Sequence, residues 1–227
     1  KIKDIEIRKW YFNETVKNGW SSNILKMQID NKLYERQAIS EKVTNFPSTL
    51  PDSQSDLALQ TMKDPYLFDF ISLKGKVKEL EIESAMINKI KDVLIELGNG
   101  FAFVGNQYKL TVSNKDYFID LLLYHLKLKC YIVVELKARE FEPTVAGQLN
   151  FYLSAIDDLV KDESDNPSIG LLLCKTKDKF TVEYALKDIN KPIGVSEYKL
   201  LEDIPEYLQS QLPKAEDIEL HIQDIEE

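Results

Sequence analysis

The sequence predicts an α/β fold in which a mixed central sheet is flanked by helices and preceded by an α-helical N-terminal segment. Residues 101–138 form strand-like segments separated by short turns, and an amphipathic helical pattern at 144–161 precedes the wholly apolar segment 168–175. Helical patterns precede the strands, at 4–43 and from Leu73 to Gly98. A strand, a helix and a further strand in this order favour a right-handed crossover, which makes the two strands parallel.

The composition is that of an ordinary globular protein, with 44% hydrophobic and 30% charged residues in a chain of 227. The longest apolar runs are too short to cross a bilayer, and no basic segment followed by an apolar stretch opens the chain. Cys130 and Cys174 lie in predicted strands without a CxxC pattern, which favours reduced, buried thiols over a disulfide or a zinc site. We therefore expect a cytoplasmic protein with no membrane partner.

The net charge of -9 is unevenly distributed along the chain. Residues 202–227 contain nine of the 38 acidic residues and a single base, Lys214. The preceding 201 residues are nearly neutral, so the overall charge does not exclude a nucleic-acid partner. We expect residues 202–227 to form a mobile acidic tail.

The N-terminal part divides into a helical segment at 1–45 and a linker at 46–72, which is rich in Pro, Ser, Asp and Thr. One apolar helical face should pack against the rest of the chain or a second copy, because a short amphipathic helix is seldom stable alone. A homodimer through these helices is therefore one possibility. The residues of this face follow the capping candidates Ser21 and Ser22, and they are Ile24, Leu25, Ile29 and Leu33.

A long helix is predicted from Leu73 to the stop signals Gly98 and Gly100. Strands should follow at 101–112, 117–125 and 130–138, then the helix 144–161, a buried strand at 168–175, a helix at 180–188 and a strand at 192–200. The apolar side of the long helix is expected to consist of Leu80, Ile87, Ile90, Leu94 and Leu97.

Three charged residues interrupt the apolar hairpin formed by the second and third strands: Asp120, Glu135 and Lys137. Residues opposite each other in a hairpin share a constant sum of positions and one face. Asp120 therefore faces Glu135 if a two- or four-residue loop is centred between residues 127 and 128, whereas a three- or five-residue loop separates them. Lys137 shares the face of Glu135. The opposite face should be apolar throughout, with Ile119, Leu121, Val134 and Leu136.

Two carboxylates this close repel each other unless a cation lies between them. Oxygen ligands with room for water suit Mg²⁺, with Mn²⁺ as a possible substitute. A metal-bound water attacks phosphodiesters at neutral pH, and a neighbouring lysine can orient that water or stabilise the phosphate. The trio thus suits phosphodiester hydrolysis, although a structural Glu–Lys ion pair would have the same pattern. His125, near the turn, is expected to be exposed.

The spacing Asp-(14 residues)-Glu-Leu-Lys resembles the motif of the PD-(D/E)XK nuclease superfamily, with Ile119 where the motif has proline. The segments LEIESAMINKIKDVLIELGNGFAFVGNQYKL, VVELKAREFEPTVAGQLNFYLSAIDD and KPIGVSEYKL resemble the catalytic domain of the YhcG-like nuclease family over about residues 75–200. NGWSSNILKMQIDNKLYER resembles the tail of that family's N-terminal helical domain.

The resemblance implies a restriction-endonuclease-like core at 73–201 and a Mg²⁺-dependent deoxyribonuclease that binds DNA. It implies that Glu83 joins Asp120 and Glu135 at the metal, with Glu81 as a competitor for that role. It also matches Gln148 and Tyr152 to a Gln-xxx-Tyr pattern that contributes to the catalytic site. The alternative is a non-catalytic DNA- or protein-binding module that keeps the nuclease fold.

Overall fold

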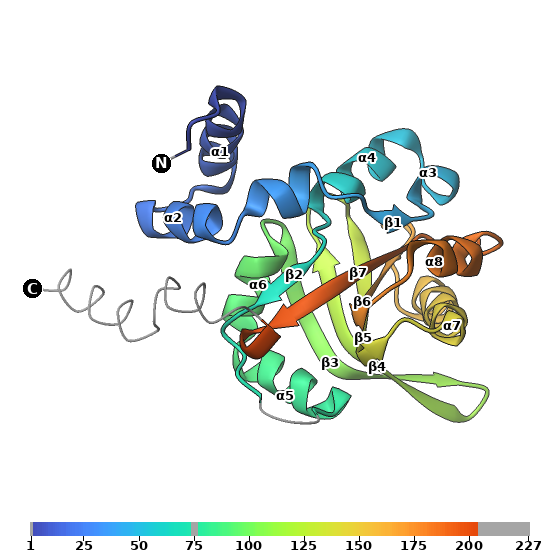
Figure 1. Cartoon of the computed structure of the whole chain (residues 1–227). Coiled ribbons are helices and arrows are strands. Elements are labelled where there is room, and N and C mark those ends of the chain that lie inside the picture. Colours follow the sequence, from blue (N-terminus) through green and yellow to red (C-terminus); the bar gives the residue numbers. More distant parts are fainter. Residues whose placement is uncertain (1, 74–76, 204–227) are drawn as a thin grey trace, which may run out of the picture.

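The computed structural model describes residues 2–73 and 77–203, and its centre is a seven-stranded mixed sheet (Figure 1). The strand order is β1-β7-β6-β5-β4-β3, and β2 also pairs with β7. The acidic residues 204–227, which we expected to be mobile, lie outside the described residues. The strands are β1 (Val43–Thr44), β2 (Tyr66–Phe68), β3 (Phe101–Val112), β4 (Lys115–His125), β5 (Cys130–Glu140), β6 (Ile169–Thr176) and β7 (Ile193–Leu200).

The predicted α/β fold is confirmed. β3, β4 and β5 form antiparallel pairs, and β5, β6 and β7 run parallel, so the crossover through α7 (Pro143–Leu159) joins parallel strands as expected. α8 (Lys179–Leu186) connects β6 to β7. The distal part of the β3–β4 hairpin projects beyond the body of the molecule (Figure 1).

Helices cover both faces of the sheet (Figure 1). One core lies between the sheet and the helices α4, α5 and α6, and the other lies between the sheet and α7 and α8. The side of α7 expected to face the sheet is buried at Val145, Leu149, Leu153 and Ile156, and Val160, the C-cap of this helix, is partly buried. Gly170 of β6 permits this packing, because a Cβ there would lie 2.8 Å from Leu149.

The segment 46–72, which we expected to be a linker, is folded into the core, so that prediction is wrong. It forms α3 (Phe46–Thr49), α4 (Asp52–Thr61) and β2. Two of its three prolines mark helix starts and not a flexible linker, since Pro47 lies in the first turn of α3 and Pro51 is the N-cap of α4. The segment buries the side chains of Phe46, Leu50, Ala58, Met62, Tyr66, Phe68 and Ile71.

The predicted long helix is divided at Lys89 into α5 (Glu79–Asn88) and α6 (Ile90–Leu97), with φ and ψ of -118° and 31° at Lys89. Its fully buried face also differs from the expected one. Leu97 is buried as predicted, and Ile87, Ile90 and Leu94 pack against the core partly buried, but Leu80 is 65% exposed. The buried face instead includes Ile82, Met86 and Val93, which were not predicted. Apolar residues occur on more than one side of this helical segment, so its periodicity is compatible with two buried faces. The position of the sheet determines which face is buried.

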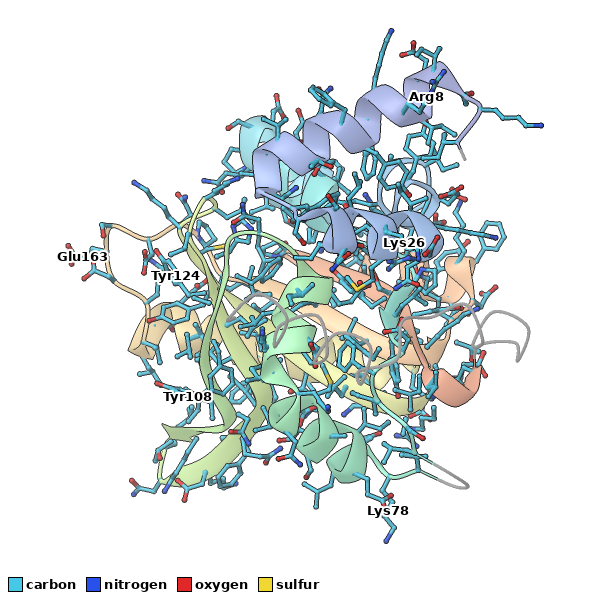
Figure 2. All side chains as sticks on the ribbon, turned by 90° about the vertical axis from the view of Figure 1, so that its left-hand side faces the viewer. Arg8, Lys26, Lys78, Tyr108, Tyr124 and Glu163 are labelled. Atoms are coloured by element: carbon cyan, nitrogen blue, oxygen red, sulfur yellow. The ribbon has the colours of Figure 1, made fainter. Side chains whose placement is uncertain are left out.

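The N-terminal segment is helical as predicted, and it forms α1 (Ile5–Asn18), α2 (Ser22–Asp30) and the π-helix η1 (Tyr34–Ala38). Ser21 caps α2, and Gly19 ends α1 with a φ of 63° that favours glycine. Tyr11 is buried; its hydroxyl donates to Gln28 O and accepts from the Tyr34 N–H. Arg8 of α1 lies at the opposite end of the molecule from Lys78, the N-cap of α5 (Figure 2).

A buried charge cluster joins this helical segment to the core. Arg36 of η1 donates to Glu96 Oε1 at 2.5 Å, and Lys63 Nζ lies 3.7 Å from Glu96 Oε2. Glu96 also accepts from the Leu67 N–H at 2.9 Å. All three charged side chains are at most 7% exposed, so each depends on the others for charge compensation.

His125 is fully buried, so the expectation of an exposed turn residue is wrong. The loop 126–129 folds back over it, and its Nδ1 accepts from the Leu128 N–H at 3.0 Å. Its ring packs edge-on against Phe101, with 4.8 Å between the centroids. Burial lowers the pKa of His125 to about 4.

We expect acidification to destabilise the protein through His125. The pKa of His125 is 6.5 in the unfolded chain and about 4 in the folded protein. The contribution of the neutral imidazole to the free energy of unfolding is therefore complete above pH 6.5 and is lost as the pH falls through 4. The loss amounts to roughly 2–3 kcal/mol. Urea unfolding between pH 7 and pH 4 should show it in wild type. His125→Asn keeps an acceptor for the Leu128 N–H but does not titrate, and an unchanged pH slope in this variant would contradict the assignment.

The cysteines Cys130 and Cys174 are free and buried, as predicted. Among the described residues, no helix combines the length and the apolar character needed to span a membrane.

Candidate active site

The register of the β4–β5 hairpin confirms the predicted turn. His125 pairs with Cys130 and Leu121 pairs with Val134, which leaves a four-residue loop at 126–129. Continuing this register away from the loop, the next two opposed positions are Asp120 and Glu135. Asp120 Oδ2 accepts from the Leu136 N–H at 2.8 Å, which fixes this carboxylate against β5.

At Asp120, the side chains of β4 change from one of the two hydrophobic cores to the other. Leu121 packs with the α5 side, as expected, but Ile119 packs with the α7 side, so the expectation of one continuous apolar face is wrong. The opposite strand is irregular at the same level. Gln107 has a φ of 42°, and it lies between two regular pairs, Asn106 with Leu121 and Tyr108 with Ile119. The left-handed residue therefore lies opposite Asp120, where β4 changes core.

β5 and α7 bring together four of the predicted site residues. Glu135 is 1% exposed, and its Oε2 lies 3.6 Å from Lys137 Nζ and 3.4 Å from Gln148 Nε2. Gln148 Nε2 also donates to Tyr152 Oη at 3.0 Å, so the residues four apart on α7 share one face as predicted. Gln148 therefore links Glu135 to the phenol of Tyr152.

The acidic residues of α5 have three different environments. Glu81 accepts from the Lys78 N–H at 2.7 Å and so caps its own helix, which separates it from the site. Glu83 is buried and accepts from Gln107 Nε2 at 2.7 Å, and Gln107 Nε2 lies 3.4 Å from Asp120 Oδ1. Glu79, one turn before Glu83, lies 3.2 Å from Lys137 Nζ.

Burial raises the pKa of each carboxylic acid at the centre of this site. For Glu135, burial and then the charge of Asp120 raise the pKa to about 8. Burial also raises the pKa values of Asp120 and Glu83. Burial opposes the charged form of Lys137, but the carboxylates of Glu135, Asp120 and Glu79 raise its pKa. The site thus gathers three carboxylic acids whose ionised forms are disfavoured by burial, and the charge of Lys137 partly offsets this effect at Glu135.

The donor set at Asp120 and Glu135 fits a hard divalent cation. Glu135 Oε1 is buried and has no hydrogen-bond partner, which leaves an oxygen free to act as a ligand. Within residues 2–73 and 77–203, no group of three His, Cys, Asp or Glu side chains is arranged to hold a metal ion. Glu83 reaches Asp120 only through Gln107, so the pair Asp120 and Glu135 offers the nearest ligands.

Sequence reasoning missed two residues of this site. Glu79 could have been found, because Glu79 and Glu83 are four apart and share one face of α5. Gln107 carried no signal, because its contribution depends on a left-handed backbone inside a strand.

A hairpin that carries Asp120 opposite Glu135-Leu136-Lys137, in a mixed sheet covered by helices on both faces, defines a restriction-endonuclease-like nuclease domain. Residues 59–213 match the family model described as the YhcG PDDEXK nuclease domain. The chain belongs to this family.

A curated relative supports the family assignment. The chain is 36% identical over 200 residues to the Escherichia coli (strain K12) protein named "Putative nuclease YhcG". The alignment covers 88% of this chain and 53% of that protein. The chain therefore spans about half the length of the curated relative it matches.

Solved structures show more distant similarity. A repair endonuclease from Pyrococcus abyssi is 15% identical, with a TM-score of 0.38, over 57% of this chain and 49% of that chain. A structure described as an EndoMS-dsDNA2 complex is 17% identical, with a TM-score of 0.39, over 61% of this chain and 50% of that chain.

Proposed function

We propose that this nuclease domain hydrolyses DNA phosphodiester bonds and depends on Mg²⁺, for which Mn²⁺ can substitute. The observation that carries the proposal is the arrangement of Asp120, Glu135 and Lys137 on one hairpin. The buried carboxylate of Glu135 and the half-buried carboxylate of Asp120 face each other there, Glu135 Oε1 has no hydrogen-bond partner, and a lysine lies beside them. A structural ion pair would need only one carboxylate for the lysine.

Each residue has a defined role in this proposal. Asp120 and Glu135 would hold the cation, which supplies an activated water and offsets charge on the phosphate. The Leu136 N–H fixes Asp120, and Gln148 fixes Glu135. Because its pKa is raised, Lys137 is charged at neutral pH in the free protein. It therefore orients the attacking water and stabilises the phosphate as a cation, and Glu79 holds it in place. Tyr152 contributes through Gln148.

DNA cleavage assays test this function. Linear, supercoiled, single-stranded and branched DNA, with RNA in parallel, would be incubated with Mg²⁺, Mn²⁺ or EDTA. Cleavage that EDTA abolishes supports the proposal and identifies the substrate. If the protein binds DNA without cleaving any substrate, and calorimetry detects no Mg²⁺ binding, a non-catalytic binding module is the better interpretation.

We also propose that the chain forms a homodimer through α1. This helix exposes three apolar side chains, Ile5, Phe12 and Val16, which are 53%, 68% and 70% exposed. A second copy would bury them and stabilise a helix that is short for an isolated one. Sedimentation equilibrium should show a dimer in wild type and a monomer in Phe12→Glu. A monomeric wild type would reject this proposal without affecting the nuclease assignment.

A further inference from the structure

Gln107 connects two of the carboxylates at the candidate site. Its Nε2 donates to Glu83 Oε2 at 2.7 Å and lies 3.4 Å from Asp120 Oδ1. Hydrogen bonds from an amide to an ionised carboxylate are stronger than neutral ones. The amide nitrogen therefore occupies the space between two groups that would otherwise repel each other.

The backbone of Gln107 adopts a left-handed conformation, which residues other than glycine rarely adopt. Its φ is 42°, although the neighbouring residues Asn106 and Tyr108 keep regular pairs with β4. Such a residue persists only where its surroundings hold it, and these positions cluster at functional sites. Here the surroundings are the carboxylates of α5 and β4, which bind the Gln107 side chain.

We infer that Gln107 is a positioning residue that gathers Glu83 and Asp120 in the cation-free site and competes with a divalent cation for their oxygens. The inference rests on the proposed metal-dependent function. An amide N–H is a donor and cannot be a ligand, so a cation that binds Glu83 and Asp120 together must displace it. With the amide in place, the described residues form no metal-binding group of three acidic, histidine or cysteine side chains.

Calorimetric titration of the DNA-free protein with Mn²⁺ tests this competition. Gln107→Leu removes the donor at similar size, so the cation no longer has to break a charge-assisted hydrogen bond. We expect the variant to bind Mn²⁺ about tenfold more tightly than wild type. The matched control is Gln54→Leu on α4, outside the site, which should leave the affinity unchanged.

A second variant keeps the test valid if Gln107→Leu does not fold. Gln107→Gly removes the amide and also relaxes the left-handed backbone. It should therefore bind Mn²⁺ as tightly as the leucine variant, and it should unfold at a higher temperature than that variant.

Several outcomes would overturn the inference. An unchanged affinity in both variants would mean that Gln107 only shapes the hairpin. A weaker affinity would mean that Gln107 assists cation binding, by gathering the carboxylates or as a ligand, and does not compete with the cation. If wild type cleaves DNA and binds Mn²⁺ but the variants match its affinity, only this inference fails. If wild type binds no Mn²⁺ and cleaves nothing, both the inference and the proposed function fail.

Discussion

Lys137→Ala is expected to reduce metal-dependent DNA cleavage by about 10²–10⁴-fold, the range typical of a positioned catalytic group. Lys137 Nζ lies 3.6 Å from Glu135 Oε2 and donates to Leu136 O at 3.0 Å, so its charge is held beside both proposed ligands. Alanine removes that charge and leaves the water without its orienting donor. Initial rates of cleavage under saturating Mg²⁺ measure the effect.

The control for this prediction is Lys187→Ala, which removes an exposed lysine that follows α8. This variant should cleave at the wild-type rate. Thermal unfolding of both variants checks that each is folded. Wild-type cleavage by a folded Lys137→Ala protein would show that Lys137 serves only as a structural partner of Glu135 and Glu79.

Glu96→Gln is expected to lower the free energy of unfolding by about 3–5 kcal/mol, the typical cost of removing one partner from a buried ion pair. Burial alone would raise the pKa of Glu96, but Arg36 and Lys63 hold it below its usual value. The neutral amide leaves both cations without a counter-charge in the interior. Urea unfolding monitored by tryptophan fluorescence gives the difference directly.

Glu163→Gln is the matched control, because it makes the same chemical change on an exposed loop at the surface (Figure 2). It should alter stability by less than about 0.5 kcal/mol. A loss below about 1 kcal/mol in Glu96→Gln would mean that the buried cluster does not depend on the charge of Glu96.

The sequence predicted the parts of the site that depend on fixed periodicities. Alternation along β4 and β5, combined with the loop length, put Asp120 opposite Glu135, and a spacing of four put Gln148 beside Tyr152. These relations follow from strand and helix geometry and need no tertiary information.

Other parts depend on tertiary contacts that no local pattern shows. The choice between Glu81 and Glu83 depends on how α5 is rotated against the sheet, and the role of Gln107 depends on one left-handed backbone position. The burial of His125 depends on the path of the following loop. Pro47 and Pro51 were interpreted as linker residues, but proline also occurs at the start of helices, and both residues lie at helix starts here.

The pairing of β1 and β2 with β7 has a consequence for aggregation. β1 covers Gly194–Val195, and β2 covers Tyr198–Leu200, so neighbouring strands satisfy the backbone groups along both halves of this sheet edge. Unpaired edge strands recruit other chains by adding strands to the sheet. A polypeptide starting at residue 73 would lack both covering strands. It would expose the edge of β7 and the apolar surface beneath it, and it would self-associate through β7.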